Sequence, residues 1–534
     1  MKNMRRIFFA FVCLVLLCLT GCENFLSEPV YTQPTSQYLV SSPEGMASTV
    51  TAMYYKDREL LRSNSDAESI MYLILLMGDD ITVPRAGEGI PQFGRCANLM
   101  SSNKYVAYYW KLNYAMIGYA NTVIGAMEKV DSTSAIAKQA VAEAKVFRAH
   151  AYLRLIQRYD NIYLTTTATT PENIDREITY APAPQGSVYA CIYRDLADAV
   201  QVLPLTTGSP GRFTRGVARH IWAKAALHHH DWQTAAEQVD SIEASGVYSL
   251  LDRPDEVFYG ADLNHSEAIL VSQWAKAIGG WYTNTSTLTN NGHRMSLHCT
   301  PQYNQEAGMT IDFESGGYPW GRLFPNAYLA SLYNRTQDSR YNAYYKYSWV
   351  YNNEKSLPRG KHIGDTLVAK NSTQYLNVHP MCTKYMDSWT KANASDAQSF
   401  KDVIIYRLAE TYLLGCEAYW HLGRMDKALY YFNKTYTRAG NPEWTGALSL
   451  QDIADEHARE LCMEGDRWNF LKREEMLLPA VRAHGGDYLV NDKGVELIAD
   501  TAIRINIQDH NVRWPIPLAQ LEIMGSSFPQ NTGY

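Results

Sequence analysis

A short turn between two predicted helices gives the clearest indication of the fold: Ala418-Tyr-Trp-His-Leu-Gly-Arg-Met-Asp-Lys-Ala428. Leu422-Gly423 is typical of a helix end followed by a tight turn, and Ala428 lies in the helix that follows. A small alanine at this place lets two antiparallel helices approach closely. A second stretch, Ala226-Leu-His-His-His-Asp-Trp-Gln-Thr-Ala-Ala236, has similar spacing. The two stretches therefore predict two copies of a helix–turn–helix unit.

Such units, repeated along a chain, are typical of tetratricopeptide-like repeats. Apolar residues recur at helical spacing over much of the chain, including 44–76, 105–129 and a long segment from about Ser134 to Tyr159. We predict helix pairs at roughly 107–160, 188–245 and 403–437, stacked as a partial solenoid. The expected fold class is mostly α, a scaffold of tetratricopeptide-like helix pairs.

Residues 246–400 differ from this scaffold. They are rich in Gly, Asn, Ser, Thr, Tyr and Trp and lack a sustained helical period. Their aromatic content argues against disorder, so we predict an ordered, loop-rich subdomain containing short strands. The helical scaffold then covers about 44–245 and 401–475, and 476–534 forms a C-terminal segment of the same domain, which spans 22–534.

The N-terminus predicts export and lipid anchoring. Lys2, Arg5 and Arg6 precede an apolar run, Ile7 to Leu19, which is too short to span a bilayer and fits a signal peptide. Leu19-Thr20-Gly21-Cys22 resembles a bacterial lipobox. We therefore expect residues 1–21 to be removed and Cys22 to carry fatty acyl chains such as palmitate, which would tether the chain to a membrane. The alternative is an ordinary secretory signal with an incidental cysteine.

Composition and motifs exclude several classes of function. The net charge of −6 provides no basic footprint for nucleic acid. The mature cysteines are far apart, which predicts neither a zinc site nor a disulfide framework. No complete catalytic motif is present, so we expect no enzyme, no metal and no cofactor. Glu456, Glu460 and Glu464 recur at helical spacing with arginines, and we interpret them as a solvated or helix-capping charge ladder.

A set of collinear motifs extends almost from end to end: Cys22–Leu26, Trp110 to Asn121, Ala142–Tyr152, Asp338-Ser-Arg-Tyr341, Tyr406–Glu410, Cys416–Ala418, Glu460-Leu461, Glu464-Gly465, Arg467-Trp468, Trp514–Pro517 and Gln530–Tyr534. With these motifs the chain resembles the SusD/RagB-like outer-membrane nutrient-binding lipoproteins. It departs from the family pattern at His457, Phe470 and Gly525-Ser526, where arginine, aspartate and Asn-Pro are usual.

The resemblance implies a lipid-anchored protein of the outer membrane that faces the cell exterior. It implies a non-catalytic subunit that captures an oligosaccharide and delivers it to a SusC-like TonB-dependent transporter. Some relatives take peptides, so a peptide-binding protein of the same architecture is the alternative. A surface glycoside hydrolase is a third hypothesis.

Sugar rings have apolar C–H faces and polar rims, so a glycan site needs aromatic rings and a few directional polar groups. Two glycine-bearing loops offer such rings, and we predict Trp281 and Tyr282 in one and Tyr318 and Trp320 in the other as ligand-binding residues. The alternative is that these rings fill the core of the subdomain itself.

Polar partners for a sugar could come from the stretch Gly78–Asn103, where by resemblance relatives carry ligand contacts. We predict Asp80, Arg95 and Asn98 as further ligand-binding residues. Arg95 could donate paired hydrogen bonds to vicinal hydroxyl groups. A surface salt bridge is the alternative role for Arg95.

Overall fold

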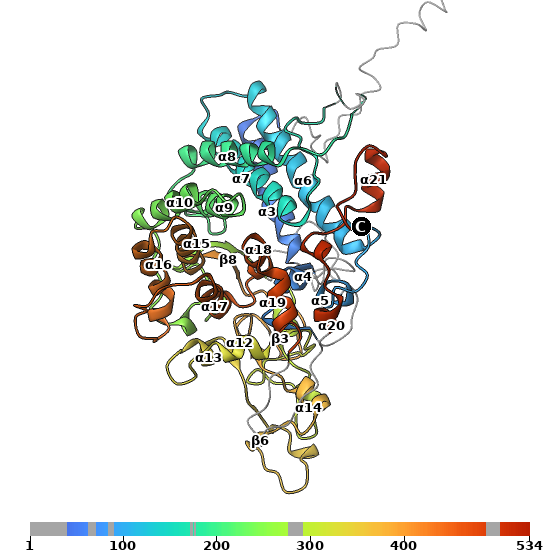
Figure 1. Cartoon of the computed structure of the whole chain (residues 1–534), viewed down its shortest axis with the longest axis vertical. Helices are drawn as coiled ribbons and strands as arrows, with labels where there is room; N and C mark the ends of the chain where they lie inside the picture. Colours follow the sequence, from blue (N-terminus) through green and yellow to red (C-terminus); the bar gives the residue numbers. More distant parts are fainter. Residues whose placement is uncertain are drawn as a thin grey trace, which may run out of the picture.

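The computed structural model describes residues 40–61, 71–83, 90–170, 173, 175, 178–275, 292–487 and 502–534. Figure 1 shows a helical scaffold in which helices from the first half of the chain are followed by helices from its last third. The yellow and orange segment that carries α12, α13, α14 and β6 lies in the lower part of the view. This arrangement confirms the predicted mostly α fold with a loop-rich part.

The scaffold is a succession of packed helices. α6 packs on α7, α7 on α8, α8 on α9, α9 on α10, α10 on α15 and α15 on α16. The N–H groups at several helix starts are capped by the side chains of Asn103, Ser134, Thr214 and Asp231. The bounds are α6 (Lys104–Ala126), α7 (Ala135–Arg158), α8 (Gln185–Val202), α9 (Arg215–His228), α10 (Trp232–Ala244), α15 (Leu408–His421) and α16 (Met425–Arg438).

The two helix–turn–helix units are confirmed, but they align one residue away from the expected register. α9 and α15 end in the same way, with a left-handed residue two positions later: His230 (φ 58°) and Gly423 (φ 69°). Ala235, and not Ala236, therefore occupies the place of Ala428, and both side chains are fully buried. The expected register was one residue away because Ala235 and Ala236 are adjacent, and only the turn geometry distinguishes them.

The helical segment expected over 44–76 is interrupted. α3 (Pro43–Asp57) ends in a short 3-10 turn at Arg58–Leu60, and α4 (Met71–Leu76) follows. Towards the C-terminus come α17 (Leu450–Leu461), α18 (Arg467–Arg473), α19 (Leu477–His484), α20 (Ala502–Asn506) and α21 (Leu518–Met524). Within the described residues, no helix is both long and apolar enough to cross a bilayer.

The loop-rich part contains short strands, as predicted. All of the described pairs are antiparallel: β1 (Ile81–Thr82) with β3 (Phe324–Pro325), β2 (Ala268–Ser272) with β8 (Val403–Arg407), β4 (Tyr345–Lys346) with β7 (Met381–Cys382), and β5 (Trp349–Val350) with β6 (Thr366–Leu367). Short helices separate them: α11 (Met295–Cys299), α12 (Ala327–Ser331), α13 (Arg340–Ala343) and α14 (Ser372–Asn377). The β1–β3 and β2–β8 pairs join segments far apart in the sequence, which holds the loops in fixed positions.

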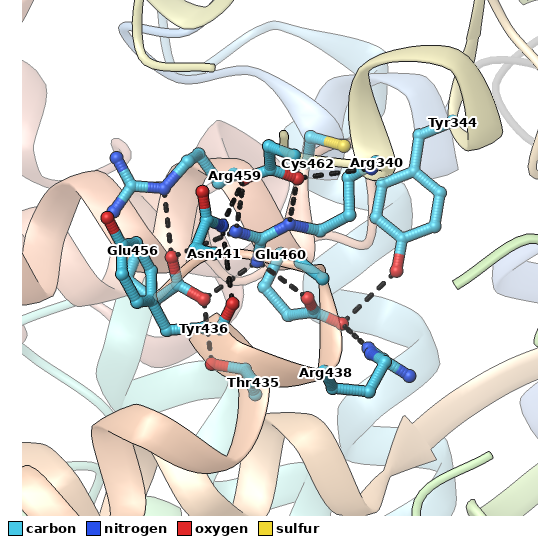
Figure 2. A network of polar contacts seen from close by, with 12 residues as sticks. Arg340, Tyr344, Thr435, Tyr436, Arg438, Asn441, Glu456, Arg459, Glu460 and Cys462 are labelled. Atoms are coloured by element: carbon cyan, nitrogen blue, oxygen red, sulfur yellow. Dashed lines mark hydrogen bonds and ion pairs between the residues drawn. The ribbon is translucent and has the colours of Figure 1, made fainter. Parts of the chain in front are cut away.

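The predicted charge ladder on α17 is wrong, because its carboxylates are buried. Glu456 and Glu460 are both fully buried, and Arg340 from α13 donates to them at 2.7 and 2.8 Å (Figure 2). Arg407 from β8 also donates to Glu460, at 2.6 Å. Burial alone would raise the pKa of the Glu460 carboxyl, but Arg438, Arg407 and Arg340 hold it well below its usual range. The network therefore joins the loop-rich part to the helical scaffold.

Candidate functional site

The Gly316–Gly321 loop holds Trp320 in a fixed position. Gly316 has a φ of 100°, and a Cβ there would lie 2.6 Å from the sulfur of Met381. Only glycine combines this backbone conformation with such a close approach. The backbone N–H of Trp320 donates to the carbonyl of Leu297 at 2.9 Å, and the backbone N–H of Arg322 donates to the carbonyl of His298 at 2.7 Å. The loop is thus bound along helix α11.

The side chain of Trp320 is partly exposed and lies among cationic and aromatic groups. The guanidinium carbons of Arg294 and Arg322 lie 5.5 and 5.2 Å from the centre of its ring. The ring of His298 packs against it with centroids 5.4 Å apart and planes at 64°. A guanidinium over an indole is attracted by the ring quadrupole, so each arginine is oriented by the tryptophan.

Partial burial leaves the two arginines less well solvated than surface arginines. Desolvation lowers the pKa of the Arg294 guanidinium, and the neighbouring Tyr318 opposes the shift. Desolvation likewise lowers the pKa of Arg322, opposed by Tyr105 at the start of α6. The arrangement offers an aromatic surface beside several N–H donors, which suits a ligand with apolar faces and many oxygen acceptors.

Tyr318 and Trp320 are thus placed in one loop, as expected. Trp281 and Tyr282, and the proposed lipidation site Cys22, lie outside the described residues. Tyr318 is partly buried and interacts electrostatically with Arg294, so it belongs to the same cluster. We call Arg294, His298, Tyr318, Trp320 and Arg322 the Trp320 cluster.

Asp80 is buried in the core and not at a surface site. It is fully buried, and neither carboxylate oxygen accepts a hydrogen bond within the described structure. Burial raises its pKa to about 7; Arg467 opposes the shift and Asp79 adds to it. Arg467 makes its own ion pair with Asp79, at 2.7 Å. The adjacent acidic residues in the sequence suggested a polar surface, but both of them face the buried Arg467.

Arg95 and Asn98 lie beside the C-terminal segment. The carbonyl of Arg95 accepts a hydrogen bond from Asn506 at 3.0 Å. Asn98 is exposed with a φ of 54°, and it lines a hollow of about 600 Å³ together with His510 and Tyr534. No described contact joins either residue to Trp320. The structure therefore does not bring Arg95 and Asn98 together with Trp320 in one site.

A cavity of about 400 Å³ lies deeper, between α3, α7 and the β2–β8 pair. Its charged side chains mostly pair with one another. Lys224 binds Glu410 and also Asp466, at 2.9 Å from the latter, and Arg154 lies 2.5 Å from Asp57. These charges are therefore already matched within the protein.

Sequence reasoning missed the two arginines of the Trp320 cluster. Arg322 lies two positions after Trp320, which was a usable signal, whereas Arg294 is 26 residues away and carries no motif. An exposed pair was also missed: Tyr259 and Trp389 are 71% and 42% exposed, with ring centroids 5.2 Å apart. Among the described residues, no group of three or more His, Cys, Asp or Glu side chains could hold a metal ion.

Fold and site together define a class of protein, a scaffold of paired helices that presents an arginine-flanked tryptophan from a loop-rich part. Comparison with known families places the chain further. Residues 281–534 match the SusD family model, and residues 77–227 match a SusD-like model described as starch-binding and associating with the outer membrane. The chain belongs to the SusD/RagB-like family.

Individual relatives agree with this assignment. A SusD-like protein of Formosa agariphila is 22% identical over an alignment of 562 positions, which covers 98% of each chain. A solved laminarin-binding SusD-like protein matches with a TM-score of 0.69 and 21% identity over 92% of this chain and 99% of the other. Surface glycan-binding protein A from Bacteroides fluxus matches with a TM-score of 0.68 and 20% identity, again over 92% and 99%. At these identities the solved structures establish the shared fold.

Proposed function

We propose that the protein is a non-catalytic glycan-binding lipoprotein of the outer-membrane surface, which captures an oligosaccharide and delivers it to a SusC-like TonB-dependent transporter. The observation that carries the glycan part is the Trp320 cluster, where a partly exposed indole lies beside two guanidinium groups. A pyranose can place its C–H face on the ring while the guanidinium groups donate to its hydroxyls.

The family supports this proposal in two respects. One matching family model is described as starch-binding and associating with the outer membrane. Two relatives of similar fold are named as laminarin-binding and as surface glycan-binding proteins. These names describe binding proteins, and they favour capture over hydrolysis for this chain.

Isothermal titration calorimetry tests the glycan-binding role. The full chain without its first 22 residues is titrated with the oligosaccharides that bind best in a glycan screen. We expect Trp320→Ala to weaken binding at least about 10-fold, because loss of ring contact and of cation–π support together costs on the order of 1.5 kcal/mol or more.

A matched control is Trp232→Ala. Trp232 is also partly exposed, but it begins α10 and stacks on His421 with centroids 3.8 Å apart, in the helical scaffold. We expect the Trp232→Ala variant to bind glycan with the affinity of the wild type. Equal affinities for wild type and Trp320→Ala would remove the Trp320 cluster as the site, and binding of peptides with no glycan bound would contradict the proposed function.

A further inference from the structure

The arginines of the Trp320 cluster have no acidic partner in the described part of the chain. No Asp or Glu oxygen there lies within 4.0 Å of the Arg294 or Arg322 guanidinium. Other partly or fully buried arginines do have such partners: Arg340 pairs with Glu456, Arg467 with Asp79 and Arg473 with Glu417. The Trp320 cluster therefore leaves two positive charges unmatched.

Two acidic side chains of the surrounding loops, Asp312 and Asp387, make hydrogen bonds to other groups. Asp312, in the loop before Trp320, accepts hydrogen bonds from the Ser315 N–H at 2.6 Å and from Asn352 at 2.5 Å. Asp387 accepts from Ser399 at 2.7 Å. A third cation, Lys391, is buried and donates to Ser296 of α11 at 3.0 Å without an ion pair to any described carboxylate. Within the described residues, the Arg294 and Arg322 guanidinium groups thus have no ion pair, although the whole chain carries −6.

Unmatched, partly desolvated charges cost free energy that an anion would offset. A guanidinium is also shaped for this role, because it donates two parallel hydrogen bonds to a carboxylate or sulfate. A neutral sugar can accept hydrogen bonds from the same groups, but it leaves both charges uncompensated. Electrostatics therefore favours a ligand that brings negative charge to the edge of the Trp320 ring.

We propose that the Trp320 cluster takes an acidic glycan, whose sugars carry carboxylate or sulfate groups that bind Arg294 and Arg322 while a sugar face packs on Trp320. This inference rests on the glycan-binding function proposed above and adds the chemical class of the ligand. Carboxylate and sulfate both accept paired hydrogen bonds from a guanidinium group, and the experiment below distinguishes between them.

The test is an array of oligosaccharides in matched pairs. Uronic-acid oligomers are compared with their carboxyl-reduced forms, and sulfated oligomers with their desulfated forms. We expect the acidic member of a pair to bind at least about 10-fold more tightly, because it adds charge-assisted hydrogen bonds to the guanidinium groups. Which pair responds identifies carboxylate or sulfate. The affinity should fall as ionic strength is raised from about 0.05 M to about 0.5 M.

Variants of the same chain without its first 22 residues test whether Arg294 and Arg322 cause this preference. Arg294→Gln and Arg322→Gln should each lose most of the preference for the acidic member, whereas Arg322→Lys, which keeps the charge, should retain most of it. Arg253→Gln changes the net charge equally, but Arg253 is an exposed residue paired with Asp255, so its preference should be unchanged. Thermal unfolding of each variant verifies that it is folded.

The outcomes distinguish the two proposals. Tightest binding to neutral glycans, or equal affinity within every pair, overturns the acidic-ligand inference and leaves glycan binding intact. A preference for acidic glycans that survives both glutamine substitutions overturns the assignment to the Trp320 cluster. Binding to no glycan on the array overturns the proposed function together with this inference.

Discussion

Arg340 Nη1 lies 2.8 Å from a carboxylate oxygen of Glu460, a residue 120 positions further along the chain. Both side chains are fully buried (Figure 2). Arg340 also pairs with Asp338 at 2.7 Å, so one guanidinium is bound to carboxylates from its own segment and from α17. The motif residues Asp338, Arg340 and Glu460 are therefore parts of one structural network.

We expect Arg340→Met to lower the free energy of unfolding by about 3–5 kcal/mol, because it leaves Asp338, Glu456 and Glu460 as buried carboxylates with fewer partners. Urea unfolding followed by tryptophan fluorescence measures this. The control is Arg253→Met, which removes an exposed ion pair and should leave the free energy of unfolding nearly unchanged. Similar losses in the two variants would contradict a structural role for the Arg340 network.

Asp80 predicts a pH-dependent stability. Burial raises its pKa to about 7, against about 3.9 in an unfolded chain. Between these values the folded protein keeps a proton that the unfolded chain has released, so the contribution of Asp80 to the free energy of unfolding falls as the pH rises. Asp80→Asn cannot ionise. We expect the variant to match the wild type near pH 4 and to exceed its stability at pH 8 by roughly 3–4 kcal/mol.

Thermal unfolding of both proteins across this pH range measures the difference. A constant difference between them from pH 4 to pH 8 would show that Asp80 does not titrate in that window. Asp160→Asn is a suitable control, because Asp160 is only partly buried and pairs with Arg513 at the surface, 2.6 Å away.

Gly316→Ala tests the loop that carries Trp320. An added methyl group would strain a backbone at φ 100° and meet the Met381 sulfur at 2.6 Å. We expect a loss of about 1–3 kcal/mol in stability and weaker glycan binding, because the ring shifts with its loop. Gly364→Ala is the matched control: it has a φ of 89°, but nothing lies within 4 Å of the added Cβ. It should lose stability through strain alone and bind glycan normally.

The proposed lipid anchor is tested by Cys22→Ser in the chain that retains residues 1–21. Without a thiol at this position no acyl chain can be attached, so we expect the variant to leave the membrane fraction and to incorporate no labelled fatty acid. Cys96→Ser is the control, since Cys96 is buried in the folded protein and should leave anchoring unchanged. Labelled Cys22→Ser in the membrane fraction would contradict lipidation at Cys22.

The helix pairs could be predicted from the sequence because their signals are local. Alanine and glycine at the turn of Ala418–Ala428, and apolar residues at helical spacing, report contacts made within one or two turns of helix. The same local signals predicted Trp320 in a glycine-rich loop. They placed the repeat register one residue away, because Ala235 and Ala236 are equivalent in sequence and only the position of the left-handed turn residue distinguishes them.

The burial of charged residues could not be predicted from the sequence. Glu456 and Glu460 have the spacing of an exposed ladder, and their burial follows from arginines that arrive from distant segments. Asp80 belongs to the same kind of error, since Arg467 meets the neighbouring Asp79 across 388 positions of sequence. Burying a charged residue costs less free energy when a partner is brought to it from elsewhere in the chain, and no local sequence pattern indicates that contact.

The paired helices, the loop-rich part, the family pattern and the place of Trp320 in a glycine-bearing loop could all be predicted from the sequence. The folded structure was needed to show that Arg294 and Arg322 flank that ring, that Asp80 is buried and that Arg95 and Asn98 lie beside the C-terminal segment. The reason is physical. Secondary structure is set by neighbours along the chain, whereas the charge and shape of a site are set by side chains that folding brings together from distant positions.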